Sequence, residues 1–171
     1  PAKFPAYLRF DGVDDAMVTV GNVDFSGTDK VTAVAGISHY RSSGTQYIVS
    51  NLNGQTTTLF VLYSSAEQSV LYLNTSGQID GVAGPSRSSF SGVLTGVIGD
   101  KMYLRENGEA LVANRVGSAA LGSVQLHLGQ IYYGGSYLNG RLYSLIVRGA
   151  QSSLSQIEAT ELYMKKKVGL P

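Results

Sequence analysis

The chain has 171 residues, a net charge of +1 and no cysteine. This length is sufficient for a buried hydrophobic core. The near-neutral charge argues against nucleic acid as the main partner. The lack of cysteine excludes disulfides and thiolate metal sites. Charged residues make up only 15% of the chain, and such a weakly charged surface, rich in glycine, serine and tyrosine, suits contact with sugars or with other subunits.

Apolar residues alternate with polar ones along most of the chain, which is the pattern of half-buried β-strands. In chain order, strands are expected around residues 6–10, 31–37, 59–63, 70–72, 102–105, 110–112 and 124–128. The segment 142–147 is apolar at both alternating positions and predicts a central strand covered on both faces. Asn107-Gly108 predicts a two-residue hairpin, because a type I′ turn needs positive φ at both positions. Many short strands separated by turns predict a sandwich or jelly roll.

Only the C-terminus has a helical pattern, and we expect a helix over about residues 155–167. Ser155 is the expected N-cap, with Glu158 completing a capping box. Gly169 is the expected stop. Glu161 is interpreted as a surface residue that pairs with Lys165 one turn later.

Four ordered groups of residues carry a resemblance to a known family. The chain opens with Phe10-Asp11-Gly12-Val13-Asp14-Asp15 before a second apolar strand, and it closes with Leu128-Gly129, then Asn139-Gly140-Arg141-Leu142, then Leu154-Ser155-Gln156-Ile157-Glu158. In this order they resemble the opening and closing motifs of concanavalin A-like, laminin-G-like jelly-roll domains. The resemblance implies one all-β domain over residues 1–171, built as a two-sheet antiparallel jelly-roll sandwich with a short C-terminal helix.

Asp11, Asp14 and Asp15 form a carboxylate cluster at the opening motif. Clustered oxygen ligands could hold calcium, and some relatives of this fold bind that ion. The alternative is structural: Asp11 accepts backbone N–H groups in a turn, and Gly12 supplies an unusual φ. We favour the turn, since the spaced aspartate pattern of calcium loops is absent. Calcium therefore stays a weaker candidate ligand, and we expect no other metal or cofactor.

Candidate ligand-binding residues gather in a glycine-rich loop near the C-terminus. It contains Tyr132, Tyr133, Tyr137 and Asn139, and residues of two earlier loops, Arg41 and Asn53, are expected to join them. Aromatic rings pack against the C–H faces of sugars while amides and hydroxyls bind sugar hydroxyls. The alternative is that these tyrosines cover the core or lie in an oligomer interface.

We find no catalytic pattern in the sequence. Glycosidases of concanavalin-like folds carry a Glu-x-Asp-x-x-Glu strand that projects carboxylates onto one face, and no such string occurs here. His39 and His127 fall at polar positions of expected strands, without acidic or thiol partners at ligand spacing. The chain is therefore not expected to be an enzyme.

These observations favour a non-catalytic module that binds glycans or a cell surface, as part of a larger virion or secreted protein. The closing segment is also similar to modules of bacteriophage tail and other virion proteins, which implies a virion or extracellular location. The expected partners are bacterial surface polysaccharide and other virion subunits, with a homo-oligomeric parent protein. A purely structural virion decoration or assembly domain is the alternative, and a polysaccharide-acting enzyme is the least favoured hypothesis.

The chain begins at Pro1 without an initiator methionine, so we expect it to be part of a longer or processed polypeptide. No apolar run reaches the about 18 residues of a membrane span, and no membrane insertion is expected.

Overall fold

The computed structural model describes residues 6–40, 44–51, 58–64, 68–75, 78–114, 120–131 and 134–170. Within them the chain forms two antiparallel sheets of six strands, a small two-stranded sheet and one helix. The elements are β1 (Leu8–Asp11), β2 (Met17–Val18), β3 (Val23–Asp24), β4 (Val31–Tyr40), β5 (Gln46–Ser50), β6 (Thr58–Ser64), β7 (Ser69–Thr75), β8 (Gln78–Ala83), β9 (Ser89–Ile98), β10 (Lys101–Glu106), β11 (Glu109–Asn114), β12 (Ser123–Val124), β13 (His127–Leu128), β14 (Asn139–Arg148) and α1 (Leu154–Val168). The predicted all-β sandwich with a C-terminal helix is confirmed.

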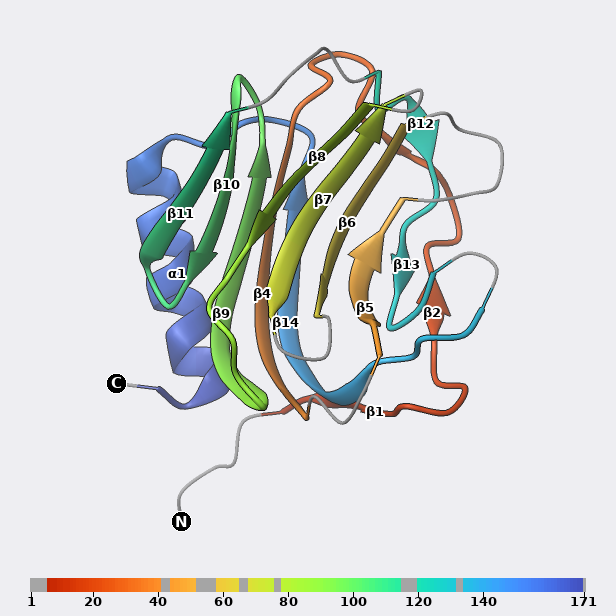
Figure 1. The fold of residues 1–171 in the computed structure, drawn as a ribbon, viewed down its shortest axis with the longest axis vertical. Helices are drawn as coiled ribbons and strands as arrows, with labels where there is room; N and C mark the ends of the chain where they lie inside the picture. Colours follow the sequence, from red (N-terminus) through yellow and green to blue (C-terminus); the bar gives the residue numbers. More distant parts are fainter. Residues whose placement is uncertain are drawn as a thin grey trace.

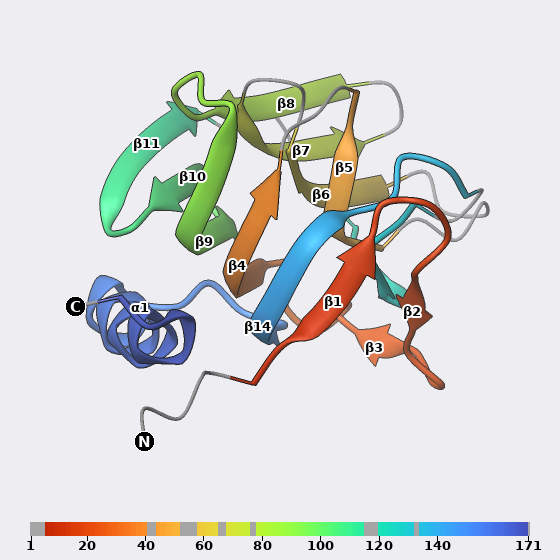
Figure 2. The same ribbon diagram turned by 90° about the horizontal axis from the view of Figure 1, so that it is seen from below.

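The two large sheets lie face to face and enclose the core (Figure 1). The first sheet has the strand order β1-β14-β4-β9-β10-β11, and the second has the order β2-β13-β5-β6-β7-β8. Helix α1 lies outside the first sheet, against β4, β9 and β14 (Figure 2). The largest fully buried side chains are Phe25, Phe60, Ile37, Ile48, Leu62, Leu71, Leu73, Leu94, Ile98, Met102, Leu104 and Leu121.

Strand β4 is covered on both faces, because the second sheet lies on one side and α1 on the other. Ala35 and Ile37 belong to the core between the sheets, whereas Val34 packs with Met164 of the helix in a separate small cluster. This explains why β4 is apolar at successive positions. The neighbouring β14 shares this environment: it pairs with β1 and β4, and its Ile146 packs against the cluster beneath α1.

The N-cap of the helix lies two residues earlier than predicted. Ser153, not Ser155, is the cap: its hydroxyl accepts the N–H of Gln156, and the Gln156 side chain accepts the N–H of Ser153. Gln156 therefore completes the capping box in place of Glu158. The predicted stop is confirmed, since Gly169 caps the helix in the left-handed conformation at φ 82°.

The Asn107-Gly108 hairpin is confirmed, because β10 and β11 pair directly across these two residues, both with positive φ.

The strand expected over 124–128 is wrong in one respect. It is split into β12, which pairs with β3, and β13, which pairs with β2 and β5 in the second sheet. The alternation continues across this break, so periodicity alone does not reveal it.

Candidate functional site

A polar pocket of about 270 Å³ opens where three distant segments meet. The turn after β1, the start of β5 and the loop before β14 each contribute to its wall. Its lining residues are Asp11, Gly12, Gly44, Thr45, Gln46, Ser136, Tyr137 and Asn139. Two of the candidate ligand-binding residues, Tyr137 and Asn139, therefore lie in one pocket with the opening aspartate turn.

Gln46 fixes the geometry of this pocket from its buried side. Its side-chain amide donates to the carbonyl of Tyr40 over 2.8 Å, and its Oε1 accepts the N–H of Asn139 over 3.0 Å. The next residue, Tyr47, donates its N–H to the carbonyl of Ser136. These bonds connect the ends of β4, β5 and β14, so the wall is held by a side chain that is only 5% exposed.

Several polar groups of the pocket are available to a ligand. Within the described residues, the side chains of Thr45, Ser136, Tyr137 and Asn139 form no hydrogen bond with one another or with the rest of the fold. Tyr137 and Asn139 are half-buried, so the fold restricts both side chains while part of each stays exposed at the pocket. A ring, an amide and hydroxyls in this arrangement suit a polyhydroxylated ligand.

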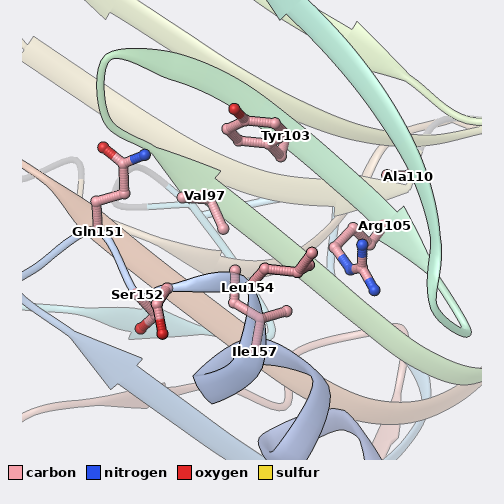
Figure 3. Close-up of a pocket in the computed structure, with 9 residues that line it drawn as sticks. Val97, Tyr103, Arg105, Ala110, Gln151, Ser152, Leu154 and Ile157 are labelled. Carbon is pink, nitrogen blue, oxygen red and sulfur yellow. The ribbon is translucent and has the colours of Figure 1, made fainter.

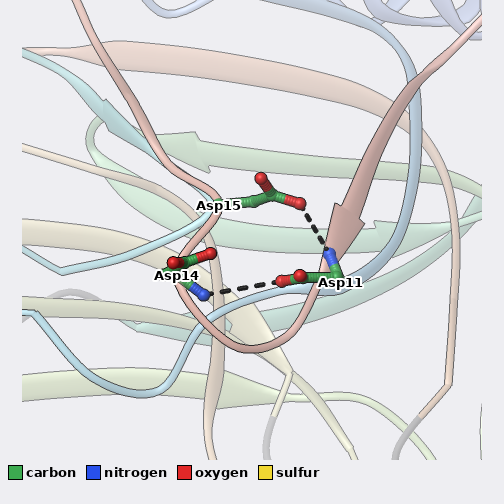
Figure 4. A group of neighbouring side chains, drawn as sticks. All are labelled: Asp11, Asp14 and Asp15. Atoms are coloured by element: carbon green, nitrogen blue, oxygen red, sulfur yellow. Dashed lines mark hydrogen bonds between the residues drawn. The ribbon is translucent and has the colours of Figure 1, made fainter.

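The aspartate turn forms one edge of the pocket (Figure 4). The Oδ1 atom of Asp11 accepts the N–H of Val13 over 2.8 Å, and Oδ2 of Asp15 accepts the N–H of Asp11 over 3.0 Å. Gly12 has φ 84°, the left-handed region that favours glycine. The N–H of Val13 is also the main reason why the pKa of Asp11 lies below its ordinary value. Asp11 and Gly12 therefore have the turn geometry expected from the sequence.

The carboxylates of Asp11, Asp14 and Asp15 have oxygens within 4.8 Å of one another. They are the one group of potential metal ligands found in the described residues. Calcium takes about six to eight oxygen ligands. Two of the three carboxylates already accept backbone N–H groups, which leaves a partial ligand set exposed to solvent. Calcium binding at these carboxylates stays a prediction.

Four further candidate residues, Arg41, Asn53, Tyr132 and Tyr133, lie outside the described residues. Sequence analysis missed Gln46, Thr45 and the contribution of Asp11 to the pocket wall. Gln46 carries a weak signal, since it is a polar residue at the start of an apolar strand. Nothing in the sequence shows that its amide reaches Asn139.

A larger pocket of about 350 Å³ lies beneath the start of α1 (Figure 3). Four of its five polar lining residues are used by the fold: Arg105 binds Glu161, Gln151 accepts the N–H of Asp100, Ser152 accepts a hydrogen bond from Arg148, and Ser153 caps the helix. The remaining wall is largely apolar, with Val97, Leu154 and Ile157 among its residues. It offers a ligand fewer available polar groups than the first pocket.

Both histidines are buried, contrary to their expected polar positions. His39 is 1% exposed and meets Phe90 edge to face, while His127 is 6% exposed. Burial lowers the pKa of His127. Both rings therefore belong to the sandwich interior, where an external substrate does not reach them.

Glu161 is also buried, so its predicted surface pair with Lys165 is wrong. Its carboxylate accepts hydrogen bonds from Arg105 and from the hydroxyl of Thr95.

Among the described residues, no helix is long and apolar enough to cross a membrane.

Comparisons with known proteins identify the fold. No family model and no curated protein matches the chain. Among solved structures, the CBM40 module of the Ruminococcus gnavus IT-sialidase bound to α2,3-sialyllactose is similar, with a TM-score of 0.63 and 18% identity over 90% of this chain and 98% of that one. Domains LG4-5 of the mouse laminin α1 chain are also similar, with a TM-score of 0.65 and 15% identity over 91% of this chain and 46% of that one.

The receptor-binding domain of botulinum neurotoxin mosaic serotype C/D gives a TM-score of 0.69 at 9% identity, over 93% of this chain and 44% of that one. At such identities the likeness shows the fold alone. The chain has the jelly-roll sandwich fold that these domains share.

Proposed function

We propose that this chain is a non-catalytic glycan-binding module, with the polar pocket between β1, β5 and β14 as its sugar site. The observation that carries the proposal is the set of half-buried polar groups without partners in the described residues, at Thr45, Tyr137 and Asn139. The ring of Tyr137 would pack against a sugar C–H face, and the amide of Asn139 would bind hydroxyls.

The structural neighbours support a sugar as the ligand. The CBM40 module was solved with sialyllactose, and a structure of botulinum neurotoxin type C, at a TM-score of 0.63 and 7% identity, describes cell entry that depends on two ganglioside molecules. The similarity covers 90% or more of this chain in both cases. A shared fold supports, but does not assign, the ligand class.

The lining of the pocket favours binding over catalysis. Glycoside hydrolysis ordinarily needs two carboxyl groups that flank the scissile bond. Asp11 is the one carboxylate among the lining residues of this pocket, and its Oδ1 is used by the N–H of Val13. Glu161, buried in an ion pair beneath α1, belongs to another part of the molecule.

The proposal includes the context expected from the sequence: a module of a larger virion or secreted protein, repeated in a homo-oligomer and located on the virion or outside the cell. A small, open, polar pocket suits weak individual binding, which becomes useful when several copies engage one surface. The weakly charged composition and the similarity of the closing segment to phage tail modules support this context.

A glycan array that includes bacterial surface polysaccharides tests the proposal, with the wild type compared with Tyr137→Ala and Asn139→Ala. We expect both variants to bind a recognised glycan roughly fivefold to tenfold more weakly. Tyr163→Ala is the matched control, because Tyr163 is an exposed tyrosine on α1. Binding that is unaffected by either pocket variant would overturn this site. A blank array would instead favour the structural virion domain.

A further inference from the structure

A pair of arginines lies directly beside the polar pocket. Arg9 of β1 and Arg141 of β14 are opposite each other in the antiparallel register, and both side chains are exposed. Their strand neighbours Phe10 and Leu142 point into the core, so the arginines project from the outer face of the first sheet. They line a further pocket of about 240 Å³, which shares Asn139 with the polar pocket.

Neither guanidinium group is neutralised within the described residues. The ion pairs found there involve other residues, namely Lys30–Asp100, Arg87–Glu106 and Arg105–Glu161. Asp11 shares a strand face with Arg9, but its carboxylate accepts backbone N–H groups of its own turn. Like charges directly opposite each other destabilise an antiparallel strand pair, and an anion bound between them would offset that repulsion.

Tyrosines surround Arg141 and fix its position. Its guanidinium lies over the ring of Tyr7 at 4.7 Å from the centroid, and Tyr7 in turn meets Tyr143 edge to face. The pKa of Arg141 is raised, first by its hydrogen bond with Tyr143 and then by Tyr7. Tyr40 completes the wall and is 67% exposed. One cation is thus held in place before a ligand arrives, with an aromatic face nearby.

We propose that Arg9 and Arg141 form an anion subsite that makes this module selective for acidic glycans, those carrying a carboxylate or a sulfate ester. The inference rests on the proposed glycan-binding function. A guanidinium group presents two parallel N–H donors that match a carboxylate or sulfate. Asn139 pairs with Asp11 two positions along the strands from the Arg9–Arg141 pair, a separation of roughly 7 Å. One oligosaccharide can therefore reach both pockets.

The test uses one oligosaccharide in three forms: neutral, carboxylated and sulfated. Binding to the wild type is compared with Arg9→Gln and Arg141→Gln, and inorganic sulfate alone is a fourth ligand. We expect the wild type to bind at least one acidic form about tenfold more tightly than the neutral form, and each arginine variant to lose most of that preference. The carboxylated and sulfated forms distinguish the two sources of negative charge.

Lys101→Gln is the matched control, because it removes one exposed positive charge from β10, and thermal melts verify that each variant is folded. Equal binding of neutral and acidic forms by the wild type would overturn the arginine subsite while leaving the glycan-binding function intact. So would arginine variants that behave like Lys101→Gln, or sulfate alone binding as tightly as the sulfated sugar. Failure of all three sugar forms to bind would overturn both proposals.

Discussion

Arg105 of β10 and Glu161 of α1 form a buried two-point ion pair that joins the helix to the outer face of the first sheet. The Nε atom of Arg105 lies 2.9 Å from Oε1 of Glu161, and Nη2 lies 3.1 Å from Oε2. Thr95 of β9 donates its hydroxyl to the same carboxylate over 2.7 Å. One glutamate therefore connects the helix to two strands.

We expect Glu161→Ala to lower the free energy of unfolding by about 3–5 kcal/mol, because it leaves the Arg105 charge buried without a partner. The double variant Arg105→Met/Glu161→Leu should lose less free energy of unfolding than Glu161→Ala, because no charge is left buried without a partner. Urea denaturation measures both. Glu158→Ala is the control, because Glu158 is exposed on the same helix. Its free energy of unfolding should lie within about 0.5 kcal/mol of the wild-type value. Equal effects of Glu161→Ala and Glu158→Ala would contradict the importance of the buried pair.

Ser153→Ala should destabilise the protein by about 0.5–2 kcal/mol, since it removes the hydroxyl that caps α1. Ser155→Ala tests the cap expected from the sequence. It should have a smaller effect, because the Ser155 hydroxyl contacts that of Ser153 rather than a free N–H of the first turn. Thermal or urea unfolding of the two variants decides between the caps, and a larger loss for Ser155→Ala would show that the helix begins later.

Gly129→Ala should be more destabilising than Gly122→Ala. Both glycines have positive φ, 78° and 67°, so both substitutions carry backbone strain. A Cβ at Gly129 would also collide with the ring of Phe10, whereas a Cβ at Gly122 would meet nothing within 4 Å. We expect the difference in unfolding free energy to exceed about 1 kcal/mol. Equal losses would mean that the loop before β14 shifts freely.

Stability should decrease as the pH falls below about 6.5, partly through His127. Burial lowers the pKa of this ring in the folded state, so in that range the unfolded chain binds a proton that the folded chain does not. Linkage then favours unfolding as the pH falls. His127→Gln should flatten the dependence of unfolding free energy on pH between 7 and 5, whatever its effect on stability at neutral pH. Identical slopes for the variant and wild type would rule out this contribution.

Asp11→Ala should lower the melting temperature at neutral pH, because the carboxylate accepts the N–H of Val13. The pKa of Asp11 is below its ordinary value of 3.8, so its contribution is present above that pH and is lost as the pH falls through the lowered value. The difference between wild type and variant should therefore shrink in acid. An unchanged difference would contradict the role of the carboxylate.

Saturating calcium provides a second measurement on the same turn. We expect no rise in the melting temperature of the wild type, since backbone N–H groups already use two of the three carboxylates. A rise that Asp14→Ala abolishes would instead support a calcium ion at Asp11, Asp14 and Asp15.

Local rules predicted much of the fold from particular residues. Asn107-Gly108 specified its hairpin because both positions need positive φ, and Gly169 specified the helix end for the same reason. The errors occur where tertiary contacts override a local preference. Ser155 was the cap expected from the sequence, whereas Ser153 caps the helix in the structure. Glu161 looks like a surface residue until Arg105, 56 positions away, supplies a buried partner.

Side-chain alternation and local backbone preference were enough to predict several of the strands, the Asn107-Gly108 hairpin, the aspartate turn and the glycine-rich loop that holds Tyr137 and Asn139. Long-range packing, in contrast, is what joins this loop to Asp11 and Gln46 in one pocket and sets Arg9 opposite Arg141. Strand register places Arg9 opposite Arg141 and Asp11 opposite Asn139, and the packing of the two sheets brings the Gln46 side chain to the N–H of Asn139. Such register is set by the packing of the whole sandwich, so no local pattern contains it.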